Sequence, residues 1–100
     1  MQGQVFGGWI LAQLDLAGAV PARRIALKTN ERAVTKAVNH IEFIAPVFIG
    51  DKVNFYTQVD RIGNTSISIH IEVIAERYTS GEFDKVAEAE FVYVKLAKLK

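Results

Sequence analysis

One stretch decides the fold: Val5-Phe6-Gly7-Gly8-Trp9-Ile10-Leu11-Ala12-Gln13-Leu14-Asp15-Leu16-Ala17-Gly18-Ala19-Val20. It is apolar on every side of a helical wheel and begins with a pair of glycines. Between Met1 and Ala22 its only ionisable side chain is Asp15. A helix that is hydrophobic all round is normally buried. The stretch therefore predicts a buried helix that carries one carboxylate.

Asp15 needs a partner from outside this helix. Its neighbours one turn away are Leu11, Ala12, Gly18 and Ala19, so no cation on the same helix pairs with it. Three of these four side chains are small, which leaves room beside the carboxylate. A buried charge is costly unless it is paired or hydrogen-bonded. Two interpretations are open here, a structural hydrogen bond to backbone or a partner chain, and a general base or nucleophile in a cleft.

The composition bounds the class of protein. One hundred residues, half of them apolar, make one domain with a single core. A net charge of +1 gives no support for a nucleic-acid surface. The absence of cysteine excludes disulfides, a thiolate nucleophile and cysteine-ligated zinc, and it fits a reducing cytoplasm.

The apolar opening is not predicted to be an export signal or a membrane span. It lacks a basic segment at its start, and Gln13 and Asp15 interrupt its apolar run. That run is also shorter than the roughly 20 residues that cross a membrane. We expect a cytoplasmic protein without a membrane partner.

The two ends of the helix carry different signals. Gly7 and Gly8 let another group approach the first unpaired N–H groups, which suits an anion or a developing oxyanion, although close packing of a helix start explains them as well. Pro21 is expected to kink or loosen the helix, and residues 28–32 are expected to form an exposed turn. The stripe predicted to face the core is Trp9, Ile10, Gln13, Leu14 and Ala17.

Strand patterns follow, over residues 33–44, 52–62, 65–78 and 85–96. Alternation is strongest in the third. Its inward residues are predicted to be Ile67, Ile69, Ile71, Val73 and Ala75, and those of the last strand Ala87, Ala89, Phe91 and Tyr93. The first strand is predicted to be covered on both sides, with Thr35, Ala37, Asn39, Ile41 and Phe43 on one face and Val34, Lys36, Val38, His40 and Glu42 on the other.

One helix followed by four strands with tight connections predicts an α+β fold, with the helix packed on one face of an antiparallel sheet. The sequence shows no internal repeat and no linker. Residues 1–100 are therefore expected to form a single domain.

Four blocks, in this order, resemble the hotdog-fold acyl-CoA thioesterases, in the bacterial branch related to the brain-type acyl-CoA hydrolases. They are residues 3–9, 13–19, 43–51 and 59–67. The resemblance implies a sheet wrapped round a central helix, dimers whose sheets join edge to edge, and assembly of dimers into a trimer of dimers. Relatives usually have a strand before the helix, and we expect that strand to be missing here or to lie upstream of Met1.

The resemblance also implies roles for the helix residues. Asp15 matches the family's helix carboxylate, which activates water as a general base or attacks the thioester carbonyl. Gly7 and Gly8 match the helix start that receives the thioester oxygen, with the N–H of Gly8 as the expected donor. The active site is expected between subunits.

The resemblance further places coenzyme A at the turn of the second strand pair. Gly63, Asn64, Thr65 and Ser66 match a turn that lies against the nucleotide in relatives, with Arg61 beside it. A plain Gly-Asn hairpin connection explains the same residues.

Four residues depart from the family or have weaker interpretations. Gln4 stands where relatives often carry Asn, Asp or Glu, so it can donate or accept a hydrogen bond but cannot act as a second carboxylate. Asn39 replaces a frequent acidic residue. His40 is interpreted as a packed interface histidine, and His40 and His70 on different strands make a poor metal site.

The sequence thus predicts a thioesterase that hydrolyses acyl-CoA to a free acid and CoA without metal or another cofactor. A non-catalytic module of the same fold that binds acyl-CoA or an acyl carrier is the main alternative. A hotdog dehydratase is disfavoured because it uses a histidine, and neither the helix nor its start carries one.

Overall fold

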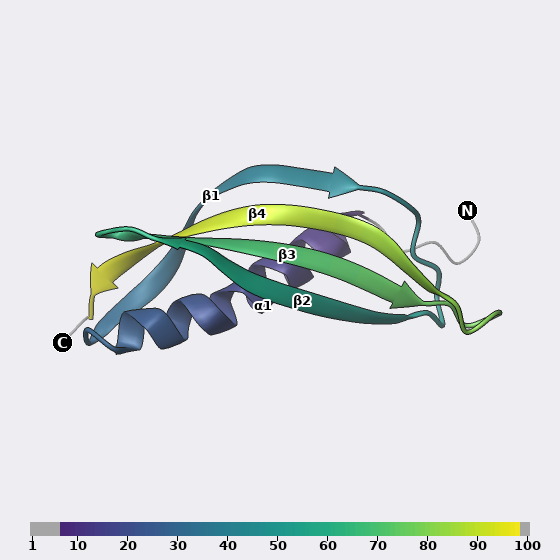
Figure 1. Cartoon of the computed structure of the whole chain (residues 1–100), viewed down its shortest axis with the longest axis horizontal. Helices are drawn as coiled ribbons and strands as arrows, with labels where there is room; N and C mark the ends of the chain where they lie inside the picture. Colours follow the sequence, from purple (N-terminus) through teal and green to yellow (C-terminus); the bar gives the residue numbers. More distant parts are fainter. Residues whose placement is uncertain (1–6, 99–100) are drawn as a thin grey trace.

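The computed structural model describes residues 7–98. A long helix is followed by strands that form one antiparallel sheet, ordered β1-β4-β3-β2 among these residues (Figure 1). The elements are α1 (Gly7–Leu27), β1 (Glu31–Phe43), β2 (Lys52–Ile62), β3 (Ser66–Glu76) and β4 (Phe83–Ala97). The α+β architecture predicted from the sequence is confirmed. The expected absence of a strand before the helix concerns residues outside this range.

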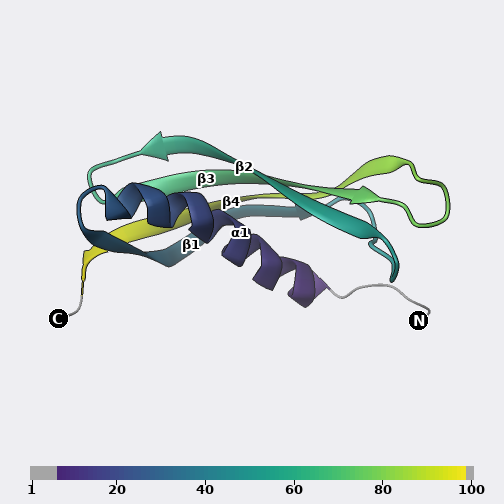
Figure 2. The ribbon, with the colours of Figure 1, turned by 90° about the horizontal axis from the view of Figure 1, so that it is seen from below.

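Helix α1 lies across one face of the sheet and leaves the other face uncovered by any described helix (Figure 2). It buries every fourth residue: Ile10, Leu14, Gly18, Ala22 and Ala26. Of the predicted stripe, Ile10 and Leu14 are buried, Gln13 and Ala17 are half-buried, and Trp9 is 47% exposed. The prediction is wrong for Trp9, and it did not extend to the later turns, which contact the sheet through Gly18, Ala22 and Ala26.

The helix ends close to the turn predicted to follow it. It continues through Pro21 to Leu27, and the kink or loosening expected at the proline stays a prediction. The turn is shorter than residues 28–32, because β1 already begins at Glu31. Asn30 takes the left-handed conformation between them, with φ of 57°, which asparagine tolerates better than most residues. Among the described residues no helix is long and apolar enough to cross a membrane.

The sheet is regular at its centre and irregular at its edges. The predicted inward residues of β3 and β4 are all buried against the helix. In β1 the pairing with β4 skips Lys36 and Asn39, so each is an extra, bulged residue. Each bulge reverses which parity of residue faces the helix. The residues paired with the inward positions of β4 are Thr35, Val38, Ile41 and Phe43. The predicted shared face of Thr35, Ile41 and Phe43 is therefore confirmed, and the prediction is wrong only between the two bulges, where Val38 takes the place predicted for Ala37 and Asn39.

An ion-pair cluster ties the loop after β1 to the β3–β4 connection. Asp51 has a side chain only 4% exposed, and its Oδ2 lies 2.9 Å from Nη1 of Arg77. The N–H groups of Tyr78 and Phe48 also donate to its carboxylate. Arg77 in turn donates to the carbonyl of Pro46 and to Asp84. The N–H groups of Tyr78 and Phe48, and then Arg77, hold the pKa of Asp51 below its usual range.

The lowered pKa gives the first prediction. Ionised Asp51 stabilises the fold above its unfolded pKa of about 3.9, and this contribution is lost as the pH falls through the lower folded pKa. Asp51→Asn should therefore reduce the free energy of unfolding by about 2 kcal/mol at pH 7 and by much less at pH 3. Urea unfolding at both pH values measures this. The control is Asp84→Asn, which removes a half-exposed partner of Arg77 and should reduce the free energy of unfolding by less. If Asp51→Asn reduced it equally at both pH values, the assignment of Asp51 would be contradicted.

Candidate active site

Asp15 is held toward the sheet by two hydroxyl groups from neighbouring strands. Thr35 on β1 donates from Oγ1 to Asp15 Oδ1 at 2.6 Å. Tyr93 on β4 donates to the backbone carbonyl of Asp15 at 2.7 Å, and its hydroxyl lies 3.3 Å from Oδ1. Within the described part of the chain, Asp15 Oδ2 accepts no hydrogen bond. One carboxylate oxygen is therefore anchored, and the other remains available for chemistry.

The approach of Tyr93 depends on Gly18, one turn after Asp15. A Cβ atom on Gly18 would lie 2.4 Å from the Tyr93 hydroxyl oxygen and 3.0 Å from Ile71 Cδ1, closer than atoms pack. The Tyr93 side chain is buried, and this burial, with the negative charge of Asp15, raises the pKa of the phenol. Tyr93 thus stays protonated and acts as a hydrogen-bond donor.

The start of α1 borders an apolar cavity. No acidic side chain lies in the first turn, so the helix provides no carboxylate of its own for its first unpaired N–H groups. A Cβ on Gly8 would meet no atom within 4 Å, whereas one on Gly7 would contact the ring of Phe43. The cavity has a volume of about 310 Å³, and its lining comprises Gly7, Ile10, residues 43–47, Val86 and Ala87.

The residues predicted to bind coenzyme A line a second cavity, of about 480 Å³. Arg61 reaches it because β2 bulges at Asp60, which pairs Arg61 with Ser68 on the helix-free face. The Gly63 N–H donates to the Ser66 carbonyl at 2.7 Å, which closes the turn. The lining comprises Asn39, Arg61, Gly63, Asn64, Thr65, Ser66, Ser68 and Val92.

The predicted site residues therefore divide between the two faces of the sheet. Asp15 lies on the helix face, and Gly7 and Gly8 open the same helix two turns earlier. Arg61 and residues 63–66 lie with Asn39 at a cavity on the opposite face. Gln4, the remaining predicted site residue, lies outside the described residues. One chain brings Asn39 to the turn that was predicted to bind coenzyme A, but it does not bring that turn to Asp15.

His40 is not packed within this chain. It pairs with Glu90 in the β1–β4 ladder, its side chain is 56% exposed, and its Nε2 lies 4.0 Å from Glu42. Its predicted place at an interface between subunits remains a prediction.

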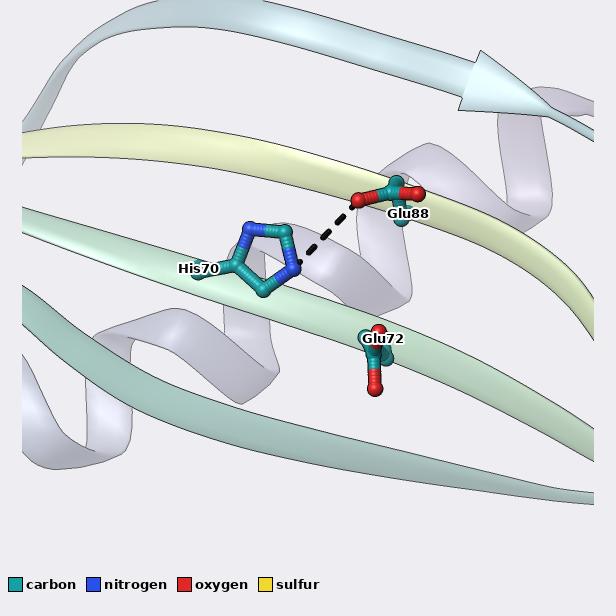
Figure 3. A group of neighbouring side chains, drawn as sticks. All are labelled: His70, Glu72 and Glu88. Atoms are coloured by element: carbon teal, nitrogen blue, oxygen red, sulfur yellow. Dashed lines mark ion pairs between the residues drawn. The ribbon is translucent and has the colours of Figure 1, made fainter.

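His70 belongs to an ion-paired cluster on the helix-free face (Figure 3). Its Nε2 lies 3.4 Å from Glu88, and one potential ligand atom each from His70, Glu72 and Glu88 lie within 4.8 Å of one another. The Lys85 ammonium contacts both carboxylates, at 3.0 Å and 2.8 Å. Lys85 and then His70 hold the pKa of Glu88 below its usual range. Because the Lys85 ammonium pairs with both carboxylates, we interpret the cluster as a network of ion pairs.

Sequence reasoning missed Thr35 and Tyr93 as partners of Asp15. Both were placed on strands, and Tyr93 was correctly predicted to face inward. The available signal was that a buried tyrosine hydroxyl usually finds a hydrogen-bond partner. Asp15 was the carboxylate for which the sequence showed no partner, so the two could have been matched.

A long helix across one face of an antiparallel sheet is the architecture of the hotdog class of protein, and here that helix also carries a carboxylate held toward the sheet. The chain belongs to the Thioesterase superfamily, whose family model matches residues 2–81. The resemblance found in the sequence is confirmed.

Individual relatives agree with this family. The acyl-CoA thioester hydrolase YciA of Salmonella typhimurium is 42% identical over 95 residues, which cover 92% of this chain and 69% of the relative. A hexameric hotdog fold thioesterase of Campylobacter jejuni, Cj0915, superposes with a TM-score of 0.87 at 44% identity, over 95% of this chain and 71% of that one. The hexameric thioesterase y2039 of Yersinia pestis gives a TM-score of 0.87 at 38% identity, over 96% and 75%.

Proposed function

We propose that this protein hydrolyses acyl-CoA thioesters to a free acid and CoA. The observation that carries the proposal is the half-buried Asp15 carboxylate, held through Oδ1 on a helix of the thioesterase family. A relative 42% identical is an acyl-CoA thioester hydrolase. The reaction needs a base or nucleophile at the thioester carbonyl and a donor for the oxyanion. Water and the chain's own groups supply both, so no cofactor is required.

The parts of the site are assigned as follows. Asp15 Oδ2 activates water or attacks the carbonyl carbon, and the first N–H groups of α1, that of Gly8 above all, bind the oxygen that becomes negative. The apolar cavity beside Gly7 receives the acyl group, since its lining consists mostly of apolar side chains. The cavity at residues 61–66 receives the nucleotide of CoA, where Arg61 faces its phosphates.

Helix geometry favours a site built from two chains. Gly8 and Asp15 are seven residues apart, which is about 10 Å along a helix. When a carboxylate attacks a carbonyl carbon directly, about 7 Å separates that carboxylate from the N–H group bound to the carbonyl oxygen. Within a single chain, Gly8 and Asp15 are too far apart for this, unless a water molecule lies between Asp15 and the carbonyl carbon. The nucleotide cavity also lies on the far face from Asp15. We therefore assign the active site to a dimer interface, and the hexameric relatives are compatible with a trimer of such dimers.

The experiment that tests the function is release of thiol from a panel of acyl-CoAs, with thermal stability measured in parallel. Hydrolysis should release CoA from at least one member of the panel. Stabilisation by CoA without thiol release would instead indicate a binding module and would contradict the proposal.

The nucleotide assignment gives a second prediction. Arg61→Gln should raise KM for acyl-CoA roughly fivefold with little change in kcat, because it removes a contact made equally in the ground and transition states. The matched control is Lys52→Gln, at the other end of β2, which removes the same charge. Equal increases in KM for both variants would point to overall charge rather than to this cavity.

A further inference from the structure

Tyr93 is the buried polar side chain whose hydroxyl reaches the backbone of the helix at Asp15. Its side chain is 1% exposed, and the hydroxyl lies 2.7 Å from the Asp15 carbonyl oxygen. We propose that Tyr93 is a positioning residue, which fixes the distance of the helical turn that carries Asp15 from the sheet and the rotation of that turn about the helix axis. The inference rests on the proposed function, because it concerns the aim of the same carboxylate.

The hydroxyl groups of Thr35 and Tyr93 hold different parts of Asp15. Thr35 and Tyr93 are paired directly across β1 and β4, so both approach from the helix face of the sheet. Thr35 holds a carboxylate oxygen and thereby the side-chain torsion. Tyr93 holds the backbone carbonyl and thereby the turn itself. A carboxylate fixed at both places presents Oδ2 in one direction.

Packing on the helix and on the sheet keeps the Tyr93 hydroxyl in contact with Asp15. Gly18 leaves the space that the hydroxyl fills, since a Cβ there would lie 2.4 Å from it. The ring of Tyr93 stacks on Phe91, with centroids 6.3 Å apart and an interplanar angle of 22°. A group that orients a catalytic side chain must itself be locked by packing. Tyr93 meets this requirement through its ring and delivers the hydrogen bond through its hydroxyl.

The role involves no proton transfer. The raised pKa of the phenol keeps Tyr93 neutral and donating over the working range of pH. Its shorter bond goes to the carbonyl and its longer contact to Oδ1. The oxygen left for water or the thioester carbon is therefore Oδ2, which neither hydroxyl contacts within hydrogen-bond distance.

The test is Tyr93→Phe, which keeps the stacked ring and removes only the hydroxyl. We expect kcat to fall about tenfold, because a small loss of alignment at the reacting group is felt mainly in the chemical step. KM and the affinity for CoA should stay within about twofold of the parent. Thiol release and a CoA titration measure these quantities. Ile69→Val, a buried change on β3, is the control for general loss of packing and should leave kcat near the parent value.

A double variant separates positioning from general structure. If Tyr93 acts through Asp15, Tyr93→Phe should cause no further loss in an Asp15→Asn background. An unchanged kcat in Tyr93→Phe, a change confined to KM, or the same tenfold loss in both backgrounds would overturn the inference. A parent protein that releases no thiol would instead overturn the proposed function and this inference together. When the parent is active and Asp15→Asn keeps only residual turnover, the comparison of the two backgrounds tests the role of Tyr93 alone.

Discussion

Asp15→Asn is expected to lower kcat for acyl-CoA hydrolysis roughly 10³-fold, since the amide neither takes a proton from water nor attacks a carbonyl carbon. The fold should survive the change. Asparagine keeps an oxygen that accepts from Thr35, and the bond from Tyr93 goes to the backbone carbonyl. Thiol release under saturating substrate measures the loss, with unfolding and oligomeric state checked on the same samples.

The comparison variant for this prediction is Glu82→Gln, which neutralises an exposed carboxylate in the β3–β4 connection. It should behave as the parent in both activity and stability. If Asp15→Asn hydrolyses butyryl-CoA as fast as Glu82→Gln, the assignment of Asp15 is wrong.

Regular elements could be predicted from the sequence because their periodicity is local. The alternation of β3, from Ile67 to Ala75, sets one face against the helix and is reproduced residue by residue. Bulges are different, because they depend on how two strands far apart in the sequence pair. The bulges at Lys36 and Asn39 together place Val38 on the helix face and Ala37 on the other, before the alternation resumes in its original phase at Ile41, and nothing in the strand's own sequence marks them.

The sequence identified the charged residue of the site, Asp15, but not the side chains that contact it. Asp15 was identified because a lone carboxylate in an apolar helix must meet something. Thr35 and Tyr93 are 20 and 78 residues away in sequence, so only the sheet register brings them to it. The Asp51–Arg77 pair was missed for the same reason, since it joins two connections 26 residues apart.

Gly8→Pro is expected to lower kcat roughly 10²-fold, because it removes the N–H group assigned to the oxyanion. Proline is tolerated in the first helical turn, where this N–H has no helical partner. Gly8→Ala is the matched control: it keeps the N–H, and its Cβ would meet no atom within 4 Å. Equal activity of the two variants would exclude the Gly8 N–H as the donor.

The same variant tests whether the site is shared between chains. In a dimer, Gly8 of an Asp15→Asn chain would meet Asp15 of a Gly8→Pro chain, so one of the two sites is intact. Mixing the two inactive variants through unfolding and refolding should restore about a quarter of the parent activity, since half of the dimers are mixed. If Gly8 and Asp15 instead act within one chain, every chain in the mixture carries a defect and no activity returns. Recovery would thus favour the two-chain site that the 10 Å separation along the helix suggests.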